Sequence, residues 1–266
     1  MRPRDVFSLS LTCVQVSERI RDSEELWRTL LRWHAPYLPL HWSISLRKLL
    51  FRMPNLWATA LLTDLMTSVG VEYWLPIAEP DFADIVRWLP ANKRLSSLEF
   101  DRVGLADAQL EAISEAIAAH GAVLRLHVKN NPKASSFDVF LRLSSLKILN
   151  LQGNDIDDVK VVQISKGLET NKSLTHLYLC NNAIGDSGVT ALAYSLAKNT
   201  TLRVLGLTDN RFGTRGVQAF VECLTENKTL QSLDLDSNDA SDDLVSAVKK
   251  VLRARRAAAL VAPVGI

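Results

Sequence analysis

The side chains with the clearest capacity for chemistry are two histidines, a cysteine and a group of aspartates. His127, His176 and Cys180 offer imidazole and thiolate groups, which are common ligands of zinc. No fourth ligand stands at a recognised spacing from them, so we expect no metal site. The aspartates between residues 234 and 243 lack the turn glycine and ordered oxygen cage of a calcium loop, which favours a solvated acidic cap.

The chain also carries none of the sequence patterns that commonly mark catalysis. It has no glycine-rich phosphate loop, no nucleophile elbow and no cysteine–histidine pair in a catalytic context. Cys223 falls between the predicted core positions of a helix, where we expect an inert thiol. We therefore expect a binding protein and not an enzyme, with no catalytic residue and no cofactor.

Composition narrows the class of partner and the setting. The 266 residues carry a net charge of +2, which gives no strong field for nucleic acid or a membrane, so we expect neither as a partner. No run of about 18 apolar residues predicts a transmembrane helix, and no signal peptide is evident. Three cysteines without metal or disulfide spacing favour a reducing compartment, so we expect a cytoplasmic location, with the nucleus as an alternative.

One sequence motif, called the leucine phrase below, occurs four times between residues 146 and 238, and the rest of the chain is organised around it. Leu-x-x-Leu-x-Leu-x-x-Asn begins at residues 146, 174, 202 and 230, so each copy follows the last by 28 residues. A fixed period of this length with this phrase is the signature of leucine-rich repeats. Less regular copies begin at Leu95 and Val123, and a half-unit occupies about residues 70–94.

The unit that begins at Val123 is shortened, because the next unit follows after only 23 residues. We expect its return segment, which contains Phe137, Phe140 and Leu143, to form a single-turn helix or irregular structure. The sequence thus predicts a helical segment over residues 1–65 and a leucine-rich-repeat domain of about six units over residues 66–255. A tail follows over residues 256–266.

Each regular unit combines a short strand, a polar turn and a helix. Leucines alternate with an outward side chain over residues 177–179, which is the period of a strand, and Asn182 can satisfy backbone groups of the turn. Residues 185–199 predict a helix with Ala191, Leu192 and Leu196 directed inward. Stacked units give an α/β solenoid with a curved parallel sheet inside and helices outside. The turn asparagines then form a ladder of Asn131, Asn154, Asn182, Asn210 and Asn238.

The residues that alternate with the core leucines face the concave side, which solenoids commonly use to bind partners. We expect a protein partner there. Tyr178 and His176 at the centre, near Arg125 and His127, have the composition of an interface hot spot. The alternative is a face that is polar only because it is solvated. The candidate partner-binding residues are Glu99, Asp101, Arg125, His127, Lys129, Asn150, Gln152, His176, Tyr178, Asp234 and Asp236.

Two resemblances bear on function. The period, with a full helix in each unit, resembles the ribonuclease-inhibitor class of leucine-rich repeats, which includes the Ran GTPase-activating proteins. The run from Asp5 to Trp33 resembles the second half of an F-box, and residues 45–53 are similar to the basic helix that often follows one. Val16 departs from the F-box pattern, and the first F-box helix is absent. The matching residues are Asp5, Leu9, Leu11, Cys13, Asp22, Leu26 and Trp27.

The F-box resemblance implies that residues 1–53 dock a Skp-type adaptor through Leu9, Leu11, Cys13, Leu26 and Trp27. The expected function is then substrate recognition for a cullin–RING (Skp–cullin–F-box) ubiquitin ligase. Alternatively, the segment only caps the first repeat, and the chain is a generic leucine-rich-repeat binding protein. A Ran-type GTPase activator is a third reading. The basic, apolar tail counts against it, because those activators often carry an acidic tail.

Overall fold

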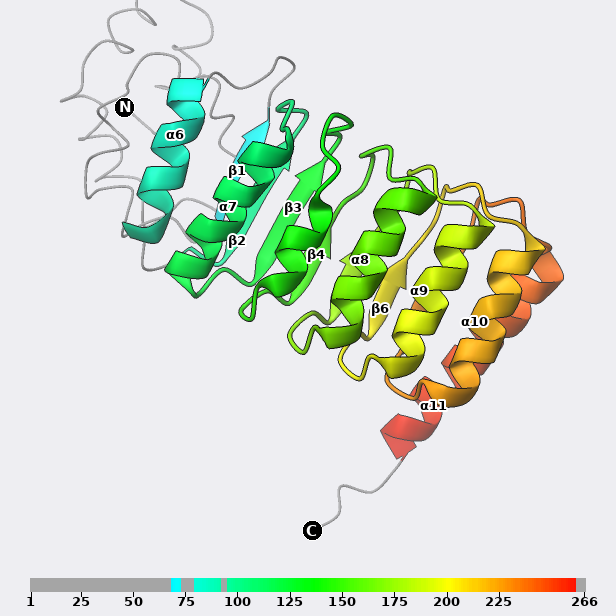
Figure 1. Cartoon of the computed structure of the whole chain (residues 1–266). Helices are drawn as coiled ribbons and strands as arrows, with labels where there is room; N and C mark the ends of the chain where they lie inside the picture. Colours follow the sequence, from blue (N-terminus) through cyan, green and yellow to red (C-terminus); the bar gives the residue numbers. More distant parts are fainter. Residues whose placement is uncertain (1–67, 73–78, 92–94, 262–266) are drawn as a thin grey trace, which may run out of the picture.

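The computed structural model describes residues 68–72, 79–91 and 95–261. The described residues form one seven-stranded parallel sheet, with its strands in chain order, and the helices that connect them (Figure 1). This confirms the predicted α/β solenoid. The strands are β1 (Ser68–Glu72), β2 (Ser97–Asp101), β3 (Arg125–Lys129), β4 (Ile148–Asn150), β5 (His176–Tyr178), β6 (Val204–Gly206) and β7 (Ser232–Asp234). The F-box-like segment, with Leu9, Leu11, Cys13, Leu26 and Trp27, lies outside the described residues.

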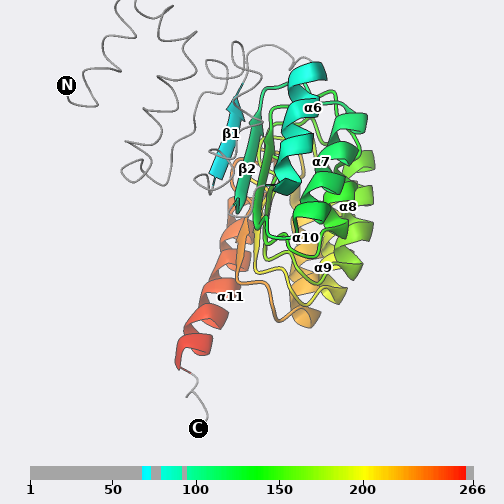
Figure 2. The same cartoon turned by 90° about the vertical axis from the view of Figure 1, so that its left-hand side faces the viewer.

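The helices form a single layer against one face of the sheet (Figure 2). They are α6 (Glu79–Trp88), α7 (Asp107–His120), α8 (Asp158–Thr170), α9 (Asp186–Lys198) and α10 (Thr214–Glu226), and a short 3-10 turn η2 (Leu89–Ala91) follows α6. The shortened unit has only the 3-10 helix η3 (Phe137–Arg142), as the sequence predicts. In α9 Leu192 and Leu196 are buried as predicted, whereas Ala191 is only half-buried and Ala193, which was not predicted, is buried.

The core lies between the sheet and this helical layer. The central leucines of successive strands pair in register, and each is buried. Five phenylalanines fill the space beside them, among them Phe137 and Phe140 of η3, which replace the missing helix of the short unit. Because each strand buries one row of side chains, the intervening residues are left on the opposite, concave face.

The predicted asparagine ladder is confirmed at the turn that follows each strand. In the unit of β5, the side-chain amide of Asn182 donates to the carbonyls of Leu151 and Leu179 at 3.1 and 2.9 Å. Its Oδ1 accepts from the Asn154 N–H at 2.9 Å. Each asparagine therefore satisfies backbone groups of its own unit and of the unit before, where no regular strand pairing exists.

A second asparagine ladder ends the helices. Asn199 is 1% exposed, and its side-chain amide donates to the carbonyls of Leu168 and Asn171 at 2.7 and 3.1 Å. Its Oδ1 accepts from the N–H groups of Thr201 and Leu202, which open the next unit, at 2.9 and 2.8 Å. Asn171 and Asn227 repeat the pattern at the same spacing.

Aspartates make a third set of links at the helix starts. Asp186 Oδ1 accepts from the N–H groups of Gly213 and Gly216 in the next unit at 2.9 and 2.8 Å. Asp158 accepts in the same way from Gly185 at 2.7 Å. Asp158 also lies close to Gly188 of the next unit. A Cβ on Gly188 would lie 2.5 Å from Asp158 Oδ1, so glycine is required at this position.

Both ends of the sheet differ from the expectation. Strand β1 precedes α6, so the predicted half-unit has a strand as well as a helix. Helix α11 (Asp242–Val261) runs past the predicted boundary at residue 255 and stands on the strand side, apart from the stack of α6 to α10 (Figure 2). Its Arg255 donates to the carbonyls of Asn227 and Leu224, and so occupies the ladder position 28 residues after Asn227.

Replacing Asn199 by alanine should destabilise the array, because the buried Leu168 carbonyl, the buried Leu202 N–H and the partly buried Thr201 N–H lose this partner. We expect a loss of about 2–4 kcal/mol in the free energy of unfolding, measured by urea denaturation. The matched control is Asn150→Ala on β4, whose side chain accepts only from the nearby Gln152 N–H. An Asn199 variant as stable as this control would show that the ladder contributes little.

The concave face as candidate functional site

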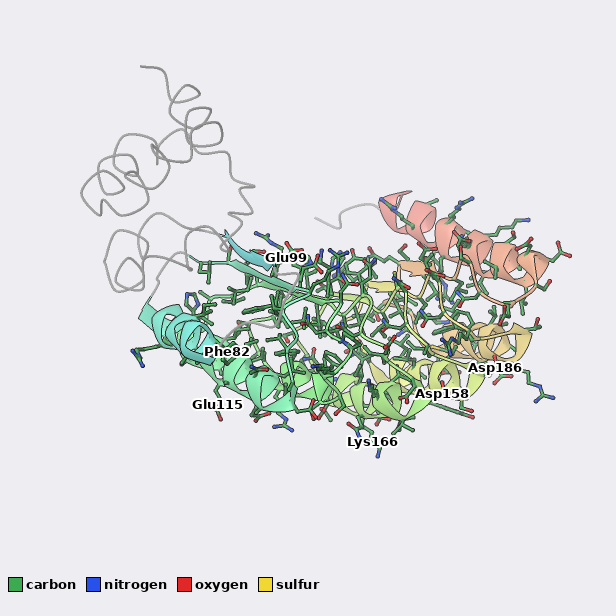
Figure 3. All side chains as sticks on the ribbon, turned by 90° about the horizontal axis from the view of Figure 1, so that it is seen from above. Phe82, Glu99, Glu115, Asp158, Lys166 and Asp186 are labelled. Carbon is green, nitrogen blue, oxygen red and sulfur yellow. The ribbon has the colours of Figure 1, made fainter. Side chains whose placement is uncertain are left out.

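The structure brings the predicted partner-binding residues together on one face, in three rows that cross the sheet. In Figure 3 the labelled Glu99 lies on the sheet side of the molecule, whereas Glu115 and Lys166 lie on the helical side. Strand register defines the first two rows, and the third lies two residues further along each unit. From β2 to β7, the first row is Ser97, Arg125, Ile148, His176, Val204 and Ser232; the second is Glu99, His127, Asn150, Tyr178, Gly206 and Asp234; the third is Asp101, Lys129, Gln152, Cys180, Thr208 and Asp236.

Charges at the β2–β3 end are paired within the face. Lys129 Nζ lies 2.5 Å from Glu99 and 3.7 Å from Asp101, and Asn130 donates to Asp101 at 2.7 Å. Burial acts to lower the pKa of Lys129, but the hydrogen bonds and charges of Glu99 and Asp101 outweigh it, so the pKa is raised. This cluster is a fixed charged border with little net charge to offer a partner.

His127 lies between this cluster and the centre. Burial lowers its pKa, the negative charge of Glu99 opposes that shift, and the positive charges of Lys129 and Arg125 add to it. The imidazole is therefore neutral at pH 7, where it can both donate and accept a hydrogen bond.

The centre of the face is aromatic and rests on a glycine. A Cβ on Gly206 would lie 3.0 Å from Tyr178 Cδ1 and 3.1 Å from Cys180 Sγ, so the absence of a side chain there lets the tyrosine ring lie against the sheet. The rings of Tyr178 and His176 have centroids 6.4 Å apart. Ile148 and Val204 are half-buried on either side of His176. The sequence indicated the aromatic centre but not the role of Gly206.

At the β7 end the face meets α11. Lys249 of this helix lies 2.5 Å from Asp236 and 3.9 Å from Asp234. These carboxylates were predicted to bind a partner, and the structure shows them paired within the chain, although both remain more than half exposed. Lys249 and these two aspartates therefore form a second charged border of the face.

His127, His176 and Cys180 were considered above as possible zinc ligands. Among the described residues, no group of three or more histidine, cysteine or acidic side chains could hold a metal ion. Burial raises the pKa of the Cys180 thiol, against hydrogen bonds from Thr208, and burial raises that of Cys223 to about 11. Both thiols are protonated at neutral pH, which fits the prediction of an inert Cys223. Within the described part of the chain, no helix is long and apolar enough to cross a membrane.

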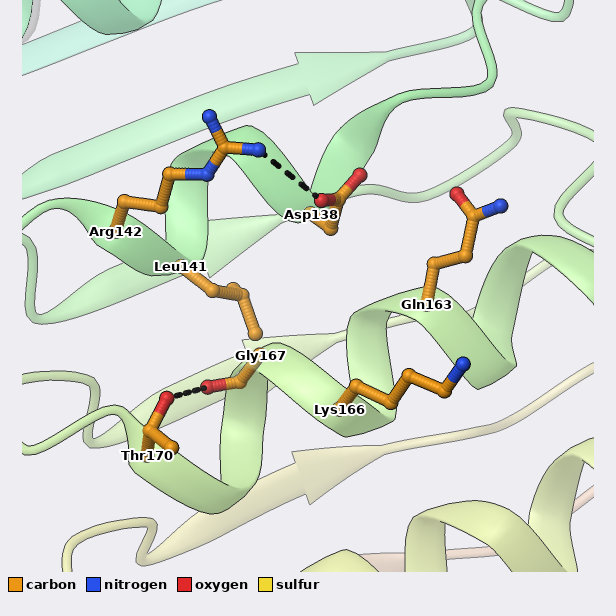
Figure 4. Close-up of a pocket in the computed structure, with 7 residues that line it drawn as sticks. All are labelled: Asp138, Leu141, Arg142, Gln163, Lys166, Gly167 and Thr170. Atoms are coloured by element: carbon orange, nitrogen blue, oxygen red, sulfur yellow. Dashed lines mark hydrogen bonds and ion pairs between the residues drawn. The ribbon is translucent and has the colours of Figure 1, made fainter.

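An open cleft of about 410 Å³ lies on the helical side, between η3 and α8 (Figure 4). It exists because the shortened unit has no full helix beside α8. Asp138 and Arg142 pair along η3 on one side of the cleft at 3.7 Å, and Thr170 donates to the Gly167 carbonyl at 3.3 Å. These groups satisfy each other, and the 23-residue spacing was the signal that could have predicted the cleft.

The pKa of His127 can be measured to test whether the neighbouring positive charges act on its ring. An NMR titration of the imidazole should give a midpoint below the ordinary value of 6.5, and Arg125→Gln should raise it, because a nearby positive charge is lost. The unfolded chain binds this proton first, so the native state should lose stability as the pH falls from 6.5 toward the lowered value. Arg203→Gln, which changes a more distant charge, should leave the midpoint unchanged.

Comparison with known proteins agrees with the fold. The leucine-rich repeat family profile matches residues 142–159, 170–193, 198–221 and 226–243. No curated protein sequence matches the chain significantly. Among solved structures, 93 chains match.

Three of these structures are described by their identity, coverage and TM-score. Actin-binding site 2 of leiomodin-1 is 18% identical with a TM-score of 0.43, covering 70% of this chain and 95% of that one. The tropomodulin C-terminal domain of Caenorhabditis elegans is 12% identical with a TM-score of 0.46, covering 68% and 96%. The TLR13–ssRNA13 complex is 14% identical with a TM-score of 0.39, covering 68% and 34%. The repeat profile and the register of the sheet together show that this chain contains leucine-rich repeats, folded as an α/β solenoid.

Proposed function

We propose that the chain is a non-enzymatic scaffold that binds a partner protein on its concave face. The observation that carries this proposal is the ring of Tyr178 seated on Gly206 at the middle of the face, with half-buried Ile148 and Val204 in the neighbouring row. Such a partly exposed aromatic centre with a polar border has the anatomy of a binding interface. Leucine-rich repeats commonly serve this purpose.

The frame favours binding because it is ordered before a partner arrives. The ladders fix each strand to the next, and the Tyr178 ring lies against Gly206, so little side-chain freedom remains to be lost there on association. The charged borders at the two ends pair internally. They would exclude water and set the register of a partner more than they would add affinity.

We further propose that the bound protein is a substrate delivered to a Skp–cullin–F-box ubiquitin ligase. This step rests on the F-box resemblance of residues 1–53 alone. In this reading Leu9, Leu11 and Trp27 hold the adaptor while the solenoid holds the substrate, and the chain itself carries no catalytic group. The generic alternative is the same concave-face binding without a ligase.

The concave-face proposal predicts that Tyr178→Ala weakens partner capture strongly. Partners captured from cell extract by the full chain would be measured for wild type, Tyr178→Ala and Tyr194→Ala. Tyr194 is the matched control, because it is 69% exposed and lies on helix α9 of the opposite layer. A buried hot-spot aromatic contributes about 2 kcal/mol or more, so we expect a fall of at least about thirtyfold for Tyr178→Ala only. Equal capture by all three chains would contradict the proposal.

The ligase step is tested separately with a purified Skp-type adaptor. We expect the full chain to retain the adaptor in a pull-down, and the double substitution Leu26→Ala/Trp27→Ala to abolish retention, because both side chains match the adaptor-facing part of the family pattern. Tyr178→Ala should retain the adaptor as well as wild type. No retention by any of the three would remove the ligase proposal and leave the concave-face proposal intact.

A further inference from the structure

The edge of the concave face where the strands begin differs in charge from the rest. The residue before each first-row position is held in line across the sheet: the N–H groups of Lys147, Thr175, Arg203 and Gln231 donate to the carbonyls of Leu124, Lys147, Thr175 and Arg203 at 2.8–2.9 Å. From β2 to β7 this line and the first row together contain three cations, Arg125, Lys147 and Arg203, and no acidic residue. We name these three exposed side chains the basic rim.

The positive charge of the basic rim is not compensated by the part of the chain that the structure describes. No described carboxylate lies within ion-pair distance of the three side chains, and Arg125 donates only to the Ser96 hydroxyl, at 3.3 Å. The four acidic residues of the face show the opposite: Glu99 and Asp101 pair with Lys129, and Asp234 and Asp236 pair with Lys249. The face therefore offers unsatisfied positive charge but little unsatisfied negative charge.

The basic rim borders the apolar part of the face. Lys147 and Arg203 directly precede Ile148 and Val204, which flank His176 in the first row. Two strand spacings separate Lys147 from Arg203, which is about 10 Å. An extended chain advances about 3.3 Å per residue and directs alternate side chains to one face. Side chains four residues apart therefore lie about 13 Å apart on the same face, which the long, flexible side chains of Lys147 and Arg203 can reach.

We propose that the basic rim and the adjoining row receive an extended acidic segment of a partner protein, in which two carboxylates about four residues apart flank an apolar side chain midway between them on the same face. The carboxylates meet Lys147 and Arg203, and the apolar side chain rests on Ile148, His176 and Val204. This inference rests on the proposed function, because it names the chemistry of the partner at the same face.

A nucleic acid would satisfy the rim less well. Its backbone carries a negative charge at every nucleotide, whereas the rim offers only Arg125, Lys147 and Arg203 to neutralise it. The apolar row would also be left uncovered by a phosphate chain. A protein segment with spaced carboxylates fits the mixture of cations and apolar side chains better.

The test is selection from a random peptide library displayed on phage, with the full chain immobilised, followed by affinity measurement on the selected peptides. We expect enrichment of aspartate and glutamate around an apolar residue. Lys147→Glu/Arg203→Glu should weaken these peptides by at least about tenfold, and binding to wild type should weaken with added salt. Lys147→Gln/Arg203→Gln should give an intermediate loss. Lys166→Glu on α8 is the matched control, because it reverses an exposed charge on the helical side.

The outcomes separate this inference from the proposed function. Selected peptides without acidic enrichment that still require Tyr178 would overturn the acidic segment and leave concave-face binding standing. Peptides indifferent to both Tyr178 and the basic rim would contradict both. Polyuridylate bound more tightly than any acidic peptide, and lost in Lys147→Glu/Arg203→Glu, would assign the rim to nucleic acid and overturn the inference. Circular dichroism of each variant verifies that the exposed substitutions leave the fold intact.

Discussion

The hydrogen bonds of buried asparagine side chains are the interaction on which this structure depends. Strands of three residues pair through few backbone hydrogen bonds. In each unit the chain passes from the strand to the helical layer and then back from the helix to the next strand. Both exits bury N–H and carbonyl groups that regular pairing cannot reach, and leaving such groups unpaired is costly. Asn182 and its equivalents satisfy the first exit, and Asn199 and its equivalents satisfy the second. An amide suits both exits because it donates and accepts at once.

The sequence predicted the features that repeat with a fixed period. Leucine spacing predicted the strands and the solenoid, and Asn182 predicted the turn, because asparagine side chains readily hydrogen-bond the backbone of a turn. The short unit was also predicted from its spacing. The alternation of core and outward residues then placed all of the concave candidates on one face.

What the sequence could not give was contact between units. Asp186 and Gly216 recur at the helix starts, but only the structure shows that the carboxylate of one unit accepts from the glycine N–H of the next. The sequence gives no role to Gly206, and only the structure shows that Tyr178 lies against it. Asp234 looked available for a partner, because nothing in the phrase predicts that α11 leaves the stack and brings Lys249 beside it. Strand β1 was missed because its valines carry neither the leucine phrase nor the asparagine.

Arg255 closes the second ladder in the described part of the chain. Arg255 stands where a further unit would place its asparagine, and its guanidinium donates to the last helix as that amide would. A guanidinium has no acceptor, so it cannot take the N–H groups that would open another strand. Each interior asparagine binds the backbone of the units on both sides of it, whereas Arg255 binds only the unit before it and so acts as a cap. An engineered copy of a 28-residue unit thus belongs between existing units, whereas one appended behind α11 would meet a surface without the acceptor it requires.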